Sequence, residues 1–429
     1  MPPFALRLVA PASVSHEEAK SSFYWLTGAQ SSFTTSLGPS LGTLGPVPTL
    51  SVDLVRLAAT VYAADRSTHR AARGSDWNQR SIELEIPVSD AAAWASVASD
   101  LEGVIGFLTG DQWTLKFNEN SAPPETVALK TTASKRIVLL SGGADSAIGA
   151  LVSRSNLADD EQHTLLSHFS ASTLAPIQRN IAARVADLIP GPQQQHLQIH
   201  FSRNQRRLDG TNYATESSSR SRSLLFLALG LAVAAVDDVP LWIPENGFAS
   251  LNPPLGPDRR GSLSTRTTHP AFLAGLSAAL AKIGAHGAIE NPFADSTKGE
   301  MFARAAAIVD ADNAAELLSA SNSCAHTGQR AFGISPAMAC GVCFGCVVRR
   351  ASFNASGVSD STTYITAGSN DRLRAWLDSI SVEAAARSFI ARGVRQRDLI
   401  ALSLPNSYPL AQALDLCRRG TSELAGLLA

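Results

Sequence analysis

A short run of small and polar residues carries the most specific chemical signal in the sequence. Ser141-Gly-Gly-Ala-Asp-Ser146 follows an apolar stretch at residues 136–140 and precedes a helix-like stretch at residues 147–152. The two glycines permit tight, left-handed backbone that a Cβ atom would forbid. Such a turn directs several N–H groups and the positive end of a helix dipole at one point, where they can hold an anion. The run predicts a nucleotide phosphate site; the alternative is an ordinary glycine-rich turn. The residues of the predicted site are Ser141, Gly142, Gly143, Ala144, Asp145 and Ser146.

The loop has no lysine after its glycines, so it is not the GxxxxGK(S/T) loop that holds β- and γ-phosphates for γ-phosphoryl transfer. Asp145 is an acid among expected phosphate donors, which suits a Mg²⁺ ligand or an anchor of the turn, and it would serve equally well as a helix cap. Arg222 begins a second apolar helix and could contact a phosphate, or face solvent. We expect Asp145, Ser146 and Arg222 to take part in catalysis.

Four of the five cysteines lie close together, in the pattern Cys324-x15-Cys340-x2-Cys343-x2-Cys346. A CxxC turn can place two thiolates about 3.7 Å apart, which is the spacing around a tetrahedral Zn²⁺ ion. Because nothing marks an open coordination position, we expect a structural zinc site; the alternative is a chance gathering of small buried cysteines. Metal ligands rather than disulfides indicate a reducing cytoplasm.

The elements that must position these residues alternate between strand and helix from about residue 135. Strand-like runs lie at residues 136–140, 164–168, 196–201 and 239–243. The alternation predicts a parallel sheet with right-handed crossovers, and ligands on such sheets bind beyond the carboxyl ends of the strands. The glycine loop should therefore share one crevice with the residues that follow the other strands, namely His168, Phe169, Ser170, Arg203, Glu245 and Asn246.

Polar residues after the fourth strand predict a substrate site. Glu245 and Asn246 could read the donor-rich edge of a purine-like base, or form a turn with a capping role. In the Pro- and Gly-rich loop that follows, cations and hydroxyls gather around Arg260, Arg266 and His269. This loop suits a lid over an anionic substrate, against the alternative of a solvated loop. His269 is either a general base or a hydrogen-bonded loop residue.

Length and composition narrow the classes of function. A chain of 429 residues can hold two or three domains with a large core. Its net charge of −1 predicts no general attraction to nucleic acid or to an anionic membrane. The first residues lack a secretory pattern, and the longest apolar run, residues 224–236, is too short to span a bilayer. We expect a cytoplasmic protein.

Changes of pattern along the chain predict its organisation. Residues 1–117 mix strand alternation with helical periodicity, which predicts an N-terminal α+β domain. Residues 118–134 have the composition of a linker. Residues 135–356 hold the alternating pattern and the cysteine cluster, and residues 357–429 read as a C-terminal helical region.

The glycine loop and the cysteine cluster together resemble the 7-cyano-7-deazaguanine synthase (QueC) family of PP-loop ATP pyrophosphatases, over roughly residues 135–353. The resemblance implies a Rossmann-like parallel sheet, the cofactors ATP, Mg²⁺ and Zn²⁺, and adenylation of the carboxylate of 7-carboxy-7-deazaguanine before an amine attacks. It also adds Lys298 as a ligand of a carboxylate or phosphate oxygen. The intermediate matches are Arg222-Ser-Leu-Leu-Phe-Leu227, Asn291-Pro-Phe293, Thr297-Lys-Gly-Glu300 and Arg349-Arg-Ala-Ser-Phe353.

Departures from that family are also informative. Ser223 stands where the family has Asn, the segment after residue 244 is longer, and both end regions are additional. This layout resembles the larger QueC-like proteins of bacterial anti-phage defence, of the QatC type in Qat systems. The resemblance implies protein partners, one of which would offer an amino group in place of ammonia. The alternatives are a stand-alone synthase for nucleoside modification, tRNA thiolation, and a non-catalytic nucleotide-binding scaffold.

Overall fold

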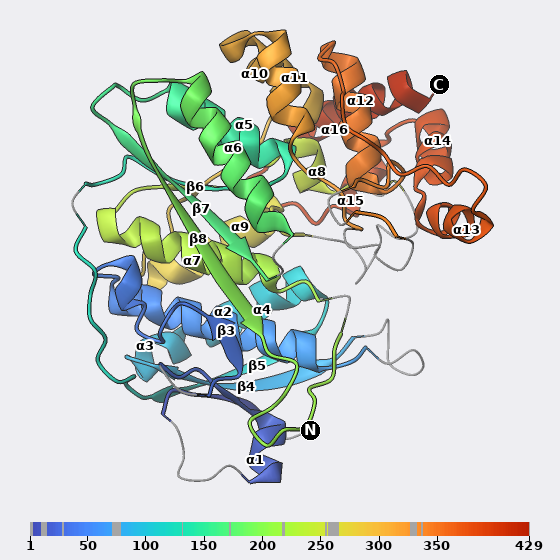
Figure 1. Cartoon of the computed structure of the whole chain (residues 1–429). Helices are drawn as coiled ribbons and strands as arrows, with labels where there is room; N and C mark the ends of the chain where they lie inside the picture. Colours follow the sequence, from blue (N-terminus) through green and yellow to red (C-terminus); the bar gives the residue numbers. More distant parts are fainter. Residues whose placement is uncertain are drawn as a thin grey trace.

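The computed structural model consists of two parallel-stranded sheets with helices around them (Figure 1). Both sheets lie in the first 290 residues, and the named elements in the described residues beyond them are all helices. The structure describes residues 3–9, 15–27, 30–70, 79–130, 132–170, 173–216, 219–253, 255, 266–326, 333–335 and 338–428.

The larger sheet has six strands in the order β10-β9-β6-β7-β8-β3, and every pair is parallel except β8 with β3. This confirms the predicted parallel sheet, and each of the four predicted strands lies at its expected place. Their bounds, and those of the two edge strands, are β6 (Ile137–Leu139), β7 (Gln162–Phe169), β8 (Gln193–Arg203), β9 (Leu241–Trp242), β10 (Ile289–Glu290) and β3 (Phe33–Thr35).

Helices cover both faces of this sheet because its strands are apolar on both sides. Val138 and Leu140 face a core with α5 (Ala144–Ser155) and α6 (Leu174–Leu188), over which lie α10 (Lys298–Val309) and α11 (Ala311–Ser319). Ile137 and Leu139 face the opposite core, which contains α7 (Arg222–Asp237) and α9 (Pro270–Lys282). The apolar run at residues 224–236 is thus a buried helix, as predicted.

The smaller sheet lies in the N-terminal region and has the order β2-β1-β4-β5. We expected an α+β region, but all three strand pairs are parallel, because helices connect the successive strands β1, β4 and β5. The elements are β1 (Phe4–Arg7), α1 (His16–Ser21), β2 (Ser22–Tyr24), the 3₁₀ helix η1 (Gly42–Leu44), α2 (Thr49–Ser67), β4 (Ser81–Val88), α3 (Ala91–Ser96), α4 (Ala98–Thr109) and β5 (Gln112–Glu119).

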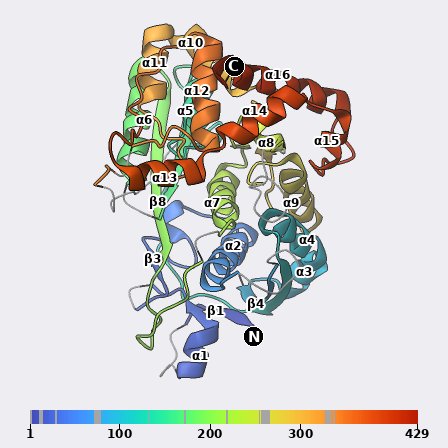
Figure 2. The same ribbon diagram turned by 90° about the vertical axis from the view of Figure 1, so that its right-hand side faces the viewer.

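The N-terminal region is joined to the larger sheet in three ways. β3 pairs with β8, so residues 33–35 form an edge of the other region's sheet. Helix α2 packs against α7, and one hydrophobic core contains residues of both (Figure 2). The segment predicted as a linker is also held, because the Glu125 carboxylate accepts hydrogen bonds from the backbone N–H groups of Ser40 and Gly42.

The C-terminal helices pack on the outer side of the cysteine cluster and of α8 (Figures 1 and 2). Their shared core also contains Phe248 and Leu251 of α8, so this region covers the segment after β9. The helices are α8 (Gly247–Leu251), α12 (Phe344–Ser356), α13 (Asp371–Ile380), α14 (Glu383–Arg392), α15 (Gln396–Ile400) and α16 (Leu410–Leu428).

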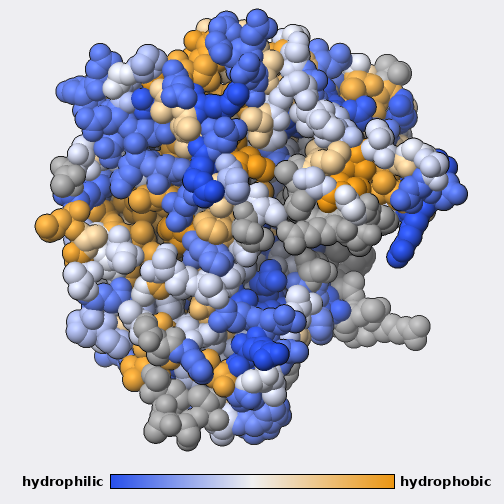
Figure 3. All heavy atoms as spheres, in the orientation of Figure 1, coloured by the Kyte–Doolittle hydropathy of each residue, from blue (hydrophilic) through white to orange (hydrophobic). Residues whose placement is uncertain are grey.

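The surface shows no single dominant apolar area on the face in Figure 3, where hydrophobic side chains form separate patches among hydrophilic ones. Among the described residues, the exposed large hydrophobic side chains include Ile400 and Leu410 of the C-terminal helices. Among the helices that the structure describes, none combines the length and the apolar character that crossing a membrane requires.

Candidate nucleotide-binding site and cysteine cluster

The glycine loop lies where the chain order of the strands reverses. The chain runs from β6 outward to β7 and β8, then returns to place β9 on the other side of β6. The segments that follow β6 and β9 therefore lie side by side beyond the carboxyl ends of their strands, which is where open α/β sheets bind ligands. Gly149 permits this close approach, since a Cβ atom there would lie 2.1 Å from Cγ of Pro244.

The loop itself has the conformation that the glycines were expected to provide. Gly142 has φ of 95°, in the left-handed region, and Gly143 is the N-cap residue of α5. The Ser146 hydroxyl donates to the Gly143 carbonyl at 2.8 Å. The N–H groups of Gly143 and Ala144 make only long contacts of 3.3 and 3.4 Å to serine hydroxyls, so an anion can replace those partners at little cost.

A cavity of about 460 Å³ opens in front of this loop. Its walls come from several parts of the chain, among them the loop, the segment after β9, the starts of α7, α10 and α12, and a strap formed by residues 321–325. The residues that carry polar groups on these walls include Ser141, Asp145, Ser146, Arg222, Glu245, Asn246, Lys298, Asn322 and Ser323.

Asp145 is the centre of a buried polar cluster. One carboxylate oxygen forms an ion pair with Nζ of Lys298 at 2.7 Å, and the other accepts hydrogen bonds from the backbone and side-chain nitrogens of Asn246, at 3.1 and 2.7 Å. Asp145 and Lys298 are only 5% and 7% exposed. Burial alone would raise the pKa of Asp145, but the Lys298 ammonium and the Asn246 hydrogen bonds lower it below its ordinary value. Both oxygens are engaged within the protein, so Asp145 fits the role of anchor better than that of Mg²⁺ ligand.

The pKa of the neighbouring acid, Glu245, is shifted in the opposite direction. Burial, followed by repulsion from Asp145, raises the pKa of Glu245 well above its ordinary value. Asn246 donates to Glu245 at 3.0 Å, while its own carbonyl oxygen accepts from Ala249 N at 2.8 Å and caps α8. The fully buried amide of Asn246 is thus used within the protein, whereas Glu245 lines the cavity.

Of the other residues predicted to take part in nucleotide binding, some line the cavities and others do not. Arg222 is exposed at the start of α7 and lines the cavity. His168 is buried and contacts the Phe201 carbonyl at 3.0 Å through Nε2, and Phe169 stacks on His200. Neither His168 nor Phe169 is among the cavity residues, whereas Ser170 lines a second cavity beside the first.

The predicted lid residues are only partly described. Arg260 lies outside the described residues. Arg266 donates to the Phe107 carbonyl at 3.1 Å and its guanidinium lies over the Phe107 ring, so it contacts α4 rather than the cavity. His269 is the N-cap of α9, where Nδ1 accepts a hydrogen bond from Ala271 N at 3.1 Å.

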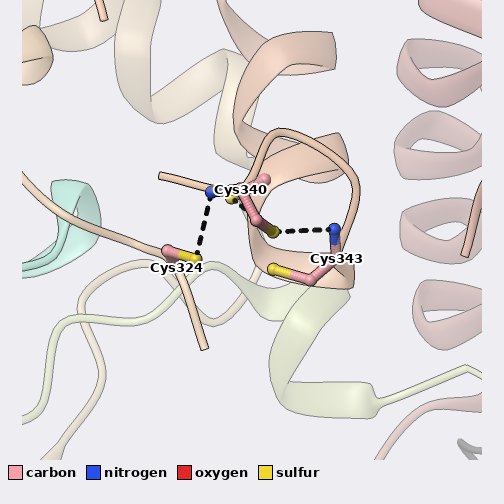
Figure 4. Close-up of side chains that lie close together, drawn as sticks. Cys324, Cys340 and Cys343 are labelled. Carbon is pink, nitrogen blue, oxygen red and sulfur yellow. Dashed lines mark hydrogen bonds between the residues drawn. The ribbon is translucent and has the colours of Figure 1, made fainter. Parts of the chain in front are cut away.

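The four predicted zinc ligands come together as a cluster, and three of them, Cys324, Cys340 and Cys343, are labelled in Figure 4. The Sγ atoms of Cys324, Cys340, Cys343 and Cys346 all lie within 4.8 Å of one another, and those of Cys340 and Cys346 are 3.8 Å apart. Backbone N–H groups point at the sulfurs, for example from Cys343 to Cys340 at 3.4 Å, which stabilises thiolate charge. Ligand number, distances and surroundings fit a tetrahedral metal ion such as Zn²⁺.

Two contacts to the site come from residues that the sequence did not single out. The N–H of Asn322 donates to the Gly142 carbonyl at 2.9 Å, which ties the strap to the glycine loop. Glu423 of α16 accepts from the Gly299 N–H at 3.1 Å and from the Thr297 hydroxyl, and so holds the start of α10, where Lys298 lies. Neither residue has a motif or a periodic pattern that could have identified it.

The site thus combines a glycine loop, a buried Asp–Lys pair, a glutamic acid with a raised pKa and a nearby cluster of four cysteines. Comparison with known proteins adds no further assignment: no protein-family model and no curated protein matches the chain. The function must therefore be inferred from the residues of the site and their geometry.

Proposed function

We propose that this chain is an ATP-dependent enzyme that activates a carboxylate by adenylation and transfers the acyl group to an amine. The observation that carries the proposal is the Ser141–Ser146 loop, which begins α5 with a left-handed glycine and forms a wall of the cavity. A loop of this kind, without a lysine after its glycines, suits a pyrophosphate leaving group rather than a transferred γ-phosphoryl group.

The proposed reaction proceeds in two displacements. A carboxylate oxygen attacks the α-phosphorus of ATP, and the bond to pyrophosphate breaks. The amine nitrogen then attacks the acyl carbon, AMP leaves with the bridging oxygen, and the nitrogen loses a proton. Both steps depend on positioning and on fixed donors near the developing charge.

Each part of the site has a role in this reaction. The N–H groups of Gly143 and Ala144 and the serine hydroxyls would hold pyrophosphate as it departs. Lys298 lines the cavity with its ammonium held by Asp145, so it is placed to contact an α-phosphate or carboxylate oxygen. Arg222 at the start of α7 supplies a further cation for the phosphates.

For the substrate, the resemblance to the 7-cyano-7-deazaguanine synthase family supports 7-carboxy-7-deazaguanine or an analogue. The resemblance to the QatC type of that family supports a role in anti-phage defence, with ammonia or an amino group of a partner protein as acceptor. Plain synthesis of the nitrile is the second candidate, although small-molecule amidation does not require the two end regions.

The decisive experiment identifies the products formed from ATP, Mg²⁺ and 7-carboxy-7-deazaguanine, with and without candidate partner proteins. AMP and pyrophosphate with a mass-shifted partner would support conjugation, and AMP with the free nitrile would support the synthase. ADP as the sole nucleotide product would overturn adenylation, and no turnover with intact nucleotide binding would favour a scaffold. Asp187→Asn, an exposed acid on α6, is the control for Asp145→Asn, which should lose turnover.

A further inference from the structure

A second cavity of about 640 Å³ continues from the first. The two share the loop serines Ser141 and Ser146, together with Arg222 and Glu245. The second cavity then extends away from the cysteine cluster toward the N-terminal region, because Tyr62 and Arg66 of α2 form part of its wall. This wall comes from the region that the sequence predicted to be a separate domain.

The second cavity carries an excess of positive charge. Arg66, Arg220 and Arg222 line it, and no salt bridge to any of the three is formed within the described part of the chain. Among the described residues of its wall, the single acid is Glu245, and burial raises the pKa of its carboxyl. Burial, with the nearby Arg70, lowers the pKa of Arg220 to about 10, so its guanidinium remains charged at neutral pH.

The two acids close to these arginines are already engaged. Asp111 pairs with Arg70 at 2.8 Å and with Arg80 at 2.6 Å. Asp65 pairs with Arg80, and its other oxygen accepts from the backbone N–H groups of Arg220 and Ser221, at 2.8 and 3.0 Å. The positive charge in the cavity is therefore left for a ligand to neutralise.

Tyr62 is an independent sign of a ligand. It is 1% exposed and lines the second cavity, yet its buried hydroxyl has no hydrogen-bond partner among the described residues. The Nε of Arg66, one turn further along α2, is likewise buried without a partner in that part of the chain, and its guanidinium lies 5.9 Å from the centre of the Tyr62 ring. Buried polar groups are normally satisfied, so these two donors point to a missing acceptor.

We propose that the second cavity binds the acid substrate, a flat-ringed carboxylate, and that Tyr62 and Arg66 of the N-terminal region help to select it. This deepens the proposed function and rests on it. Leu139, Phe226 and Ile243 supply apolar surface for a ring, while the arginines and the tyrosine hydroxyl supply donors for its anionic substituent. The volume suits a small molecule, and the shared wall with the glycine loop would bring its carboxylate to the ATP α-phosphate.

Binding of two probes to the full-length, zinc-loaded protein tests this assignment without turnover. The probes are 7-carboxy-7-deazaguanine and its uncharged carboxamide, titrated calorimetrically against wild type, Tyr62→Phe, Arg66→Gln and the control Arg372→Gln, an exposed residue of α13. We expect the acid to bind more tightly than the amide. Arg66→Gln should weaken acid binding by about tenfold or more, and Tyr62→Phe by about fivefold.

Folding effects can be separated from binding effects because Tyr62→Phe removes an unpaired hydroxyl. Its melting temperature should equal or exceed that of wild type, and its affinity for ATP should be unchanged. Equal acid affinity in wild type and both α2 variants, or no acid binding to wild type, would overturn the inference. AMP formation that is insensitive to both variants would overturn it while leaving the proposed function intact. If the variants lose acid binding but the wild-type protein forms no AMP, the inference would be supported and the proposed function would be overturned.

Discussion

At the scale of single residues, the charge of the site is set by three side chains in contact. Lys298 forms an ion pair with Asp145, and the pKa of Glu245 is raised by burial and then by repulsion from Asp145. A buried ion pair contributes little to stability in comparison with an apolar pair, but loss of one partner leaves a costly uncompensated charge. Truncation of Asp145 is therefore expected to reduce stability as well as turnover.

We predict that Lys298→Ala abolishes AMP formation and destabilises the fold by about 3–5 kcal/mol, because it leaves the Asp145 carboxylate buried without a counter-ion. Chemical denaturation and a coupled pyrophosphate assay would measure the two effects. The double variant Asp145→Asn with Lys298→Met removes both charges and should recover most of the stability without recovering turnover. Equal stability of the single and the double variant would contradict the pairing.

We predict that Glu245→Gln is more stable than wild type at alkaline pH. The folded-state pKa of Glu245 is raised above its ordinary value of 4.5, so the carboxyl favours the folded state below that pH and loses this advantage as pH rises through the folded-state pKa. Glutamine stays neutral throughout. The difference in unfolding free energy should therefore be near zero at pH 4 and grow as the pH rises above 4.5; a difference that does not change with pH would refute the raised pKa.

At the scale of elements, the cysteine cluster is connected to the glycine loop through the 321–325 strap. Cys324 of this strap belongs to the cysteine cluster. Its neighbours contact the glycine loop: the Asn322 N–H donates to the Gly142 carbonyl, and the Ser323 hydroxyl accepts from Ala144 N at 3.4 Å. A metal ion that fixes Cys324 would therefore also fix Asn322 and Ser323, which contact the glycine loop. Under the proposed function, a metal ion in the cluster would affect phosphate binding through the position of the strap.

Removal of the metal is expected to weaken ATP binding. Cys343→Ser, or chelation of the wild-type protein, should lower the zinc content below one equivalent and raise the dissociation constant for ATP at least fivefold. Elemental analysis and nucleotide titration would measure both quantities. Cys417→Ala, which changes a buried cysteine outside the cluster, is the matched control and should retain zinc and affinity. Natively purified protein without any bound metal would refute the cluster's role.

The strands and helices were largely predictable because their hydrophobic periodicity is local. The alternation around residues 136–140 and 164–168 predicted β6 and β7, and with them the crevice. Periodicity does not reveal which strands pair, so the parallel order of the N-terminal sheet and the attachment of β3 to β8 were missed. Glu423 and Asn322 could not be predicted either, since each acts on a residue more than a hundred positions away and lies in no motif.

At the scale of the whole molecule, the N-terminal region and the region of the larger sheet share buried contacts and one hydrophobic core. Asp65 of α2 accepts three hydrogen bonds from the start of α7, including one from the Ser221 hydroxyl at 2.7 Å, and pairs with Arg80. Asp65 is fully buried, and the apolar residues of α2 and α7 share one core. The two regions should therefore unfold as one cooperative unit.

This cooperativity can be tested through Asp65. Asp65→Asn should destabilise the protein by about 3 kcal/mol, because buried donors of α7 and Arg80 lose a charged acceptor. Fluorescence of Trp94 in the N-terminal region and of Trp242 in the larger sheet should still change in one transition. Asp100→Asn, in the exposed pair with Lys282 that also bridges the regions, should cost less than about 1 kcal/mol. Two separate transitions in wild type would contradict the shared core.

The contact of Glu423 with Thr297 and Gly299 has a consequence for synthesis of the protein. On the ribosome, the sheet and the glycine loop emerge long before α16, so a nascent chain can build the phosphate pocket while the start of α10 still lacks its final clamp. Lys298 would reach its working position only after residue 423 has left the exit tunnel. Under the proposed function, consumption of ATP would then begin only once α16 has docked.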